Sequence, residues 1–117
     1  MKIFIGYMPE NWNSYINAER TNKYAANQIK QREKQIVKFF TKGKIYSGGY
    51  PAEIIVRPHY DAMRQDLDNC RYKGLLDGLV SAGVLKNDNL KCLRKITLEP
   101  VFDDKIGIEF EILPYEG

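Results

Sequence analysis

A strictly alternating segment near the C-terminal end constrains the fold of this chain most strongly. Between positions 106 and 112, apolar residues alternate with small or acidic ones: Ile106, Ile108, Phe110 and Ile112 against Gly107, Glu109 and Glu111. A period of two places each set on its own face of a β-strand. One face of this strand must be buried while the other meets water. The sequence therefore predicts a sheet with a covering layer on one side.

Three other segments have the composition of strands. They are rich in β-branched and aromatic residues, and they span residues 2–8, 52–59 and 93–98. In the second of them, the run Ile54-Ile55-Val56 is continuous and apolar. Such a run is typical of a strand covered on both faces. A turn at Asp103-Asp104 is expected between the last two strands.

Two segments have apolar residues at helical spacing, residues 18–41 and residues 69–82. In the first, Arg32 and Glu33 interrupt the apolar stripe, so this helix is expected to be only partly amphipathic. In the second, Gly83 follows at the position where a left-handed residue ends many helices.

The expected elements follow the order strand, helix, strand, helix, strand, strand. We interpret residues 10–17 as an ordered loop and residues 42–50 as a turn or loop. At 117 residues the chain fits one domain, residues 1–117. The prediction is a single α+β domain whose mixed sheet has about four strands, with two helices packed on one of its faces.

The cysteine content and the apolar runs indicate the compartment. Cys70 and Cys92 are too few for a disulfide framework or a zinc site, so both are expected to be reduced and buried. No apolar run approaches the roughly 18 residues of a membrane helix. The apolar stretch in residues 1–7 is too short for a signal peptide. We therefore expect a cytoplasmic protein that does not associate with a membrane.

Charge is unevenly distributed, although the formal net charge is only +3. Residues 19–44 contain eight basic and two acidic residues, whereas residues 99–117 contain one basic and six acidic residues. A basic N-terminal half indicates a polyanionic partner. A merely solvated helix face would give the same count, so charge alone leaves both interpretations open.

The residues best suited to bind a metal ion or to take part in catalysis begin between the second strand and the second helix. Asp66-Leu67-Asp68-Asn69 places two aspartates on the same side of an extended segment. A divalent cation would relieve their repulsion, and Mg²⁺ is the natural candidate because it takes oxygen ligands and shares substrate phosphates. Lys73 follows on the helix, and Asp88 lies where the chain must return toward the sheet. An Asp-X-Asp pair alone is also common on surface loops, so its context carries the argument.

Together these residues resemble the core motif of the RusA family of Holliday junction resolvases. The similarity runs through Asp66-Leu67-Asp68-Asn69, Lys73, Leu76-Asp77-Gly78-Leu79, Ala82-Gly83-Val84-Leu85 and Asn87-Asp88. Lys73 lies one residue further from Asp68 than in the family pattern, so Tyr72 competes for the position of the family lysine. Asn87 replaces the first residue of the family's Asp-Asp pair.

The resemblance implies a Mg²⁺-dependent endonuclease, with Mn²⁺ as a substitute, that resolves four-way junctions in recombination and repair. Asp66, Asp68 and Asp88 would be the metal ligands, Lys73 the catalytic lysine, and Asn69 a supporting residue. The products would carry a 5′-phosphate and a 3′-hydroxyl. Two symmetric cuts imply a homodimer with a two-fold axis. No small-molecule cofactor is implied.

Six residues are candidates for contacts with DNA. The basic ones would bind phosphates, and the aromatic ones would stack on bases: Arg57, Arg64, Lys42, Lys44, Trp12 and Tyr15. An ordinary surface cation or a core aromatic residue is an alternative interpretation for each. His59, the only histidine, has no partner in the sequence and is interpreted as structural.

Two other functions remain open. A phage or prophage DNA-binding protein on the same fold would bind junctions without cutting them, although the three acids and the lysine argue against lost catalysis. A structural protein with a coincidental Asp-X-Asp pair would neither bind Mg²⁺ nor prefer branched DNA.

Overall fold

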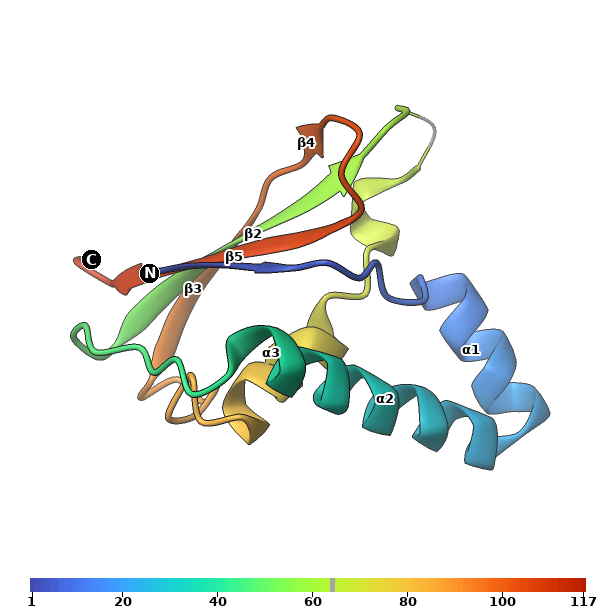
Figure 1. Ribbon diagram of the computed structural model, residues 1–117, viewed down its shortest axis with the longest axis horizontal. Coiled ribbons are helices and arrows are strands. Elements are labelled where there is room, and N and C mark those ends of the chain that lie inside the picture. Colours follow the sequence, from blue (N-terminus) through green and yellow to red (C-terminus); the bar gives the residue numbers. More distant parts are fainter. Residues whose placement is uncertain (64) are drawn as a thin grey trace.

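The structure is a computed structural model that describes residues 1–63 and 65–117, in two layers of secondary structure (Figure 1). The strands are β1 (Lys2–Ile5), β2 (Ala52–Tyr60), β3 (Leu93–Leu98), β4 (Val101–Phe102) and β5 (Gly107–Pro114). The helices are α1 (Trp12–Thr21), α2 (Lys23–Thr41) and α3 (Lys73–Ser81), and a 3-10 turn, η1, spans Leu67–Asn69. The prediction of an α+β fold with one mixed sheet is confirmed.

The sheet has the strand order β1-β5-β2-β3, and β4 pairs with β2 beyond the end of β3. β5 is antiparallel to both β1 and β2, whereas β2 and β3 are parallel. A parallel pair needs a crossover connection, usually a helix, and α3 supplies it here. The segments on either side of α3, which contain the candidate site residues, are thereby tied to neighbouring strands.

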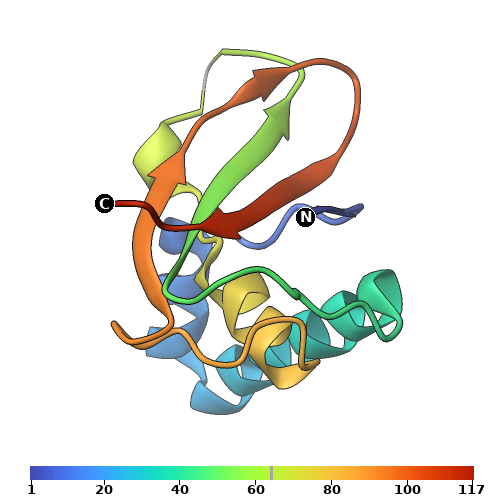
Figure 2. The same ribbon diagram turned by 90° about the vertical axis from the view of Figure 1, so that its left-hand side faces the viewer.

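The helices lie together on one face of the sheet, as the two ribbon views show (Figures 1 and 2). From β5, the side chains of Ile108, Phe110 and Ile112 are buried beneath them in the hydrophobic core. Glu109 and Glu111 alternate with these residues and are only half-buried. The alternating segment therefore has the predicted role, although Ile106 precedes the strand and is exposed.

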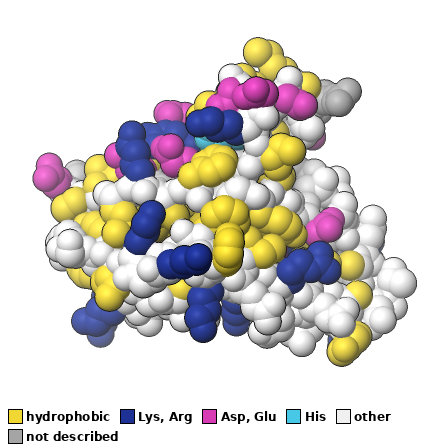
Figure 3. Space-filling model, in the orientation of Figure 1, with side chains coloured by type: hydrophobic (Ala, Val, Ile, Leu, Met, Phe, Trp, Pro, Cys, Tyr) yellow, Lys and Arg dark blue, Asp and Glu magenta, His cyan; other side chains and the backbone are white. Residues whose placement is uncertain are grey.

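The other face of the sheet is open. Ile55 pairs in register with Glu111 on this face and is half-buried, whereas Ile54 and Val56 are fully buried on the helical side. The prediction that this run is covered on both faces is therefore wrong. In the space-filling view, most of the visible Asp and Glu side chains lie over the sheet, whereas Lys and Arg side chains lie both over the sheet and along the lower, helical side (Figure 3).

The N-terminal helices differ from the prediction at two asparagines. The expected loop over residues 10–17 is largely helix α1, which Asn11 caps by accepting a hydrogen bond from the Ser14 backbone N–H at 2.8 Å. The expected helix over residues 18–41 is divided at Asn22, which caps α2 by accepting from the Tyr24 N–H at 2.9 Å. Asparagine is favoured both in loops and as an N-cap. Composition alone therefore did not distinguish the two.

The second expected helix is shorter than predicted. Residues 67–69 form the 3-10 turn, and the α-helix begins only at Lys73. Gly83 has the expected left-handed conformation, with a φ of +82°. The two-residue strand β4 was not expected, because its segment is too short to show a period. None of the described helices is both long and apolar enough to cross a membrane.

Candidate functional site

The turn that carries the Asp-X-Asp pair is held by two contacts at its C-terminal end. Tyr60, the last residue of β2, contacts the Cys70 thiol just after η1. The Asn69 side chain accepts a hydrogen bond from the Asn13 backbone N–H at 3.3 Å, which joins η1 to the first turn of α1. Burial raises the pKa of Tyr60 to about 12 and also raises the pKa of the Cys70 thiol. Both groups are therefore neutral near pH 7.

Three of the predicted site residues line one groove of about 600 Å³: Asp68, Lys73 and Asp88. Asp68 comes from η1, Lys73 from the start of α3, and Asp88 from the loop between α3 and β3. The rest of the groove is mostly apolar and is formed by Trp12, Cys70, Tyr72, Leu76, Leu93, Ile96 and Leu98. A polar rim over an apolar floor is typical of a ligand-binding hollow.

The Lys73 ammonium group pairs with two carboxylates, of which Asp88 lines the groove. Its Nζ donates to Asp77 Oδ1 at 2.6 Å and to Asp88 Oδ2 at 3.0 Å. The contact with Asp77, followed by that with Asp88, raises the pKa of Lys73. Lys73 is therefore a stable cation and is unsuited to be a general base. Tyr72 lines the same groove but carries no charge, so Lys73 supplies the ammonium group of this site.

Asp88 is held by its neighbour. The Asn87 side chain accepts hydrogen bonds from the backbone N–H groups of Asp88, at 2.7 Å, and Asn89, at 3.2 Å. An asparagine side chain that bonds the backbone just after it stabilises a tight turn. Asn87 thus has a turn-forming role at the position where the RusA-like pattern has an acid.

Asp66 lies apart from the other two acids. It lines a neighbouring cleft of about 490 Å³, together with Asn69, His59 and Cys70. Cys70 borders both hollows. The expected extended segment is instead a 3-10 turn for which Asp66 is the preceding residue, so the alternation argument does not apply to Asp66 and Asp68.

The fit of these residues to Mg²⁺ rests on two carboxylates. Over residues 1–63 and 65–117, no three His, Cys, Asp or Glu side chains are grouped closely enough to hold a metal ion. The predicted three-acid cluster is therefore not assembled here. Mg²⁺ commonly uses only one or two protein carboxylates and takes its other ligands from water and substrate phosphates. Asp68 and Asp88, on one groove, fit that chemistry.

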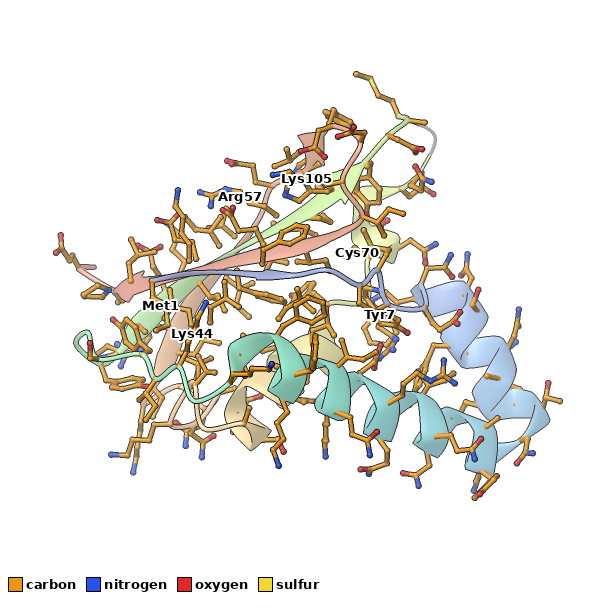
Figure 4. All side chains as sticks on the ribbon, viewed as in Figure 1. Met1, Tyr7, Lys44, Arg57, Cys70 and Lys105 are labelled. Atoms are coloured by element: carbon orange, nitrogen blue, oxygen red, sulfur yellow. The ribbon has the colours of Figure 1, made fainter. Side chains whose placement is uncertain are left out.

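Arg57, a candidate for contacts with DNA, lies on the open face of the sheet, away from the helices (Figure 4). Its guanidinium group pairs with Glu99 at 3.1 Å, Glu109 at 2.7 Å and Glu111 at 2.8 Å. The strand register brings these residues together, because Arg57 stands directly opposite Glu109. Arg57 is thus neutralised and separated from the groove by the sheet. Arg64, the other arginine candidate, lies outside the described residues.

The remaining candidates for contacts with DNA divide by position. Lys42 and Lys44 are exposed just past the end of α2, and Figure 4 places Lys44 far across the view from Cys70. Trp12 is partly exposed and borders the groove. Tyr15 is buried, with the Arg71 guanidinium carbon 4.3 Å from its ring centroid, so its ring is not available for stacking.

A buried ion pair that no sequence pattern predicted lies behind the site. Arg71 Nη2 donates to Glu33 Oε2, and both side chains are almost fully buried. Arg71 Nε also donates to the Glu10 carbonyl oxygen at 3.1 Å. Gly74 leaves room for the pair, because a Cβ there would overlap Glu33 Oε1.

The ionisation of this pair follows from its arginine. Burial raises the pKa of Glu33, while the Arg71 charge acts in the opposite direction. A guanidinium group does not lose its proton in proteins, so Arg71 requires a carboxylate beside it. The signal in the sequence was Glu33 itself, a charged residue on the apolar stripe of a helix.

His59 has a structural partner. Its Nδ1 lies 2.9 Å from both carboxylate oxygens of Asp103, and its ring packs edge-on against Phe4. The hydrogen bond with His59 is the main cause that lowers the pKa of Asp103. The pair joins β2 to the turn between β4 and β5. Cys70 and Cys92 are both free and buried, as expected.

A scan against protein-family models and a search of curated proteins found no match to the chain.

Proposed function

We propose that the protein is a Mg²⁺-dependent endonuclease that cuts branched DNA, with Asp68, Lys73 and Asp88 in its active site. One observation carries this proposal. Lys73 and Asp88 are 15 residues apart, yet their side chains meet at 3.0 Å in a groove that Asp68 also lines. A lysine beside two carboxylates of one groove is a suitable arrangement for binding a divalent metal ion and, through that ion, a phosphate group.

Each residue has a distinct role in the proposed site. Asp68 and Asp88 would hold Mg²⁺, which when bound polarises the scissile phosphate and lowers the pKa of a water molecule. Lys73 keeps its proton, so it stabilises the negative charge that develops as the phosphodiester is attacked. Asn69 holds η1 against α1 and thereby positions Asp68. Asp66 is proposed as a third acidic residue that acts from the adjoining cleft.

The substrate proposed from the resemblance is a four-way junction formed during recombination or repair in the cytoplasm. Two symmetric cuts would require two copies of the groove related by a two-fold axis, which a homodimer provides. Trp12 borders the groove and is the aromatic side chain best placed to stack on a base near the branch point.

The test is a gel assay with a synthetic four-way junction in Mg²⁺ or Mn²⁺. Asp68→Asn is expected to retain junction binding and to lose cleavage by at least about 10²-fold, because a metal ligand is removed at little steric cost. Glu116→Gln is the control, since this exposed acid lies at the far end of the chain. An Asp68→Asn variant that cuts at the wild-type rate would refute the assignment.

A DNA-binding protein without catalysis is the second candidate. Two observations favour it: Asp66 lines the adjoining cleft, and Asp88 is paired with Lys73. Within the described residues, the three acids therefore do not form one cluster. The same assay separates the two functions. Junction binding by the wild-type protein without any nicking, even in Mn²⁺, would establish the second candidate.

A further inference from the structure

The surface of α2 and the loop after it is more basic than the sequence suggests. Between Asn22 and Ala52 the only acidic residue is Glu33, and Glu33 is buried against Arg71. The surface of this region therefore carries basic side chains without an exposed acid. They number seven: Lys23, Lys30, Arg32, Lys34, Lys38, Lys42 and Lys44.

Four of these side chains form a line along α2, which we call the lysine stripe: Lys23, Lys30, Lys34 and Lys38. Their separations of seven, four and four residues place them within an arc of about 80° and over a length of about 22 Å on an ideal helix. Lys34 is half-buried and the other three are exposed. No member of the stripe forms a salt bridge within the described part of the chain.

The lysine stripe belongs to the same layer as the groove. α2 packs directly against α3, where Gly74 and Gly78 allow Glu33 and Val37 to approach closely. Lys30 Nζ lies 5.7 Å from the centroid of the Tyr15 ring. The interaction with the Tyr15 side chain is the main cause that raises the pKa of Lys30. The charges of Glu19 and Asp77 add to this effect. Asp77 is the residue that holds Lys73 at the rim of the groove. The stripe and the groove are thus neighbouring features of one side of the molecule.

The charge of the stripe identifies its partner as a nucleic acid. A helix that binds a membrane surface needs an exposed apolar face beside its basic residues. In α2 most of the apolar face, which includes Ala26 and Val37, is instead buried in the domain. The exposed aromatic residues Tyr24 and Phe39 stand near opposite ends of the helix and do not form a continuous apolar face. A line of cations about 22 Å long matches the phosphates of roughly six base pairs along one strand.

We propose that the lysine stripe of α2 binds the phosphate backbone of a duplex arm of DNA and directs that arm toward the groove. This inference deepens the proposed function and rests on it, because it names the surface that supplies most of the affinity. The contacts are to phosphates and carry no sequence information. The stripe therefore explains how the protein would hold arms of any sequence.

The experiment measures binding of a labelled duplex and a labelled four-way junction over a range of salt concentrations, without divalent metal. The stripe variant replaces Lys23, Lys30, Lys34 and Lys38 by glutamine. The control variant makes the same change in net charge at four other exposed lysines: Lys2, Lys91, Lys95 and Lys105. Thermal unfolding checks that both variants are folded, and the double variants K23Q/K30Q and K34Q/K38Q replace the stripe variant if it is not.

The association constant K for DNA falls as salt rises, so a plot of log K against log[salt] has a negative slope. In the stripe variant the magnitude of this slope is expected to be smaller by about 3 to 4, because each phosphate that is no longer neutralised removes about 0.9. Each double variant should reduce it by about 2, and the control variant by less than about 1. Equal reductions in the stripe and control variants would overturn the proposal. Stronger wild-type binding to anionic lipid vesicles than to DNA would overturn it as well.

These outcomes are independent of the nuclease activity. A protein that never cuts but shows the expected slopes would refute the nuclease and support the stripe. If the wild-type protein cuts junctions but the stripe variant has the wild-type slope, the proposed role of the stripe is refuted and the proposed nuclease activity is supported.

Discussion

An arginine pairs with glutamate on each side of the sheet, in the helical layer and on the open face, but the surroundings differ. On the helical side, the Arg71 and Glu33 side chains are 3% and 0% exposed. On the open face, Arg57 is 19% exposed, and its partner Glu99 is 60% exposed. Water can solvate the outer charges if a partner is removed, whereas the inner charges have no such substitute. Removing one partner of the ion pair is therefore expected to cost much more free energy of unfolding on the covered side than on the open face.

The comparison also separates the side that carries the candidate site from the open face. Arg71 lies between η1 and α3, so the buried pair fixes the segment that presents Asp68 and Lys73. The open face carries the Arg57 cluster, and its arginine is neutralised by Glu99, Glu109 and Glu111. We therefore expect substitutions on the covered side to affect both stability and the site, and those on the open face to affect stability slightly.

The largest effect is expected from breaking the buried pair. Arg71→Met should lower the free energy of unfolding by about 3 to 5 kcal/mol, because Glu33 is left buried without a counter-charge. Urea unfolding followed by circular dichroism measures this. The double variant Arg71→Met with Glu33→Leu should recover most of that stability, since two apolar side chains replace the pair. If Arg71→Met lowers the free energy of unfolding by less than about 1 kcal/mol, the buried pair contributes no more than an exposed pair does. That result would contradict the proposed difference between the two sides of the sheet.

The next largest effect is expected from the glycines of α3. In an exposed helix, replacing glycine by alanine adds up to about 1 kcal/mol of stability. Here Gly78→Ala would place a Cβ 2.7 Å from Val37 Cγ2, and Gly74→Ala would overlap Glu33. Each should instead cost about 1 to 3 kcal/mol. Gly49→Ala is the control, because its Cβ would only touch Pro114 at 3.9 Å. A gain in thermal stability for both helix variants would show that α2 and α3 are not packed this closely.

The smallest effect is expected on the open face. Arg57→Met should cost about 1 kcal/mol, and Glu99→Gln less than about 0.5 kcal/mol, because exposed pairs are solvated and screened. The destabilisation by Arg57→Met should shrink at high salt, whereas that by Arg71→Met should not. Unfolding curves at low and high salt measure both. A destabilisation by Arg57→Met as large as that by Arg71→Met would contradict the comparison.

Patterns within short segments were enough to predict much of the fold. The alternation in residues 106–112 predicted a half-covered strand, and Gly83 predicted the end of α3. These features depend on periods of two and 3.6 residues, which are properties of the local backbone. The order of the predicted elements, in which the chain must return to the sheet after the second helix, predicted that Asp88 would lie toward the sheet. Local patterns did not distinguish Asn11 and Asn22 as helix caps from asparagines in a loop.

Contacts between distant segments were decided only by the tertiary structure. Glu33 and Arg71 are 38 residues apart, and Arg57 and Glu109 are 52 apart. No local pattern encodes such pairs, because they depend on strand order, register and helix packing. The sequence by itself predicted four candidate residues for the site: Asp66, Asp68, Lys73 and Asp88. The packing of η1, α3 and the following loop decided that Asp68, Lys73 and Asp88 share one groove while Asp66 lines the next.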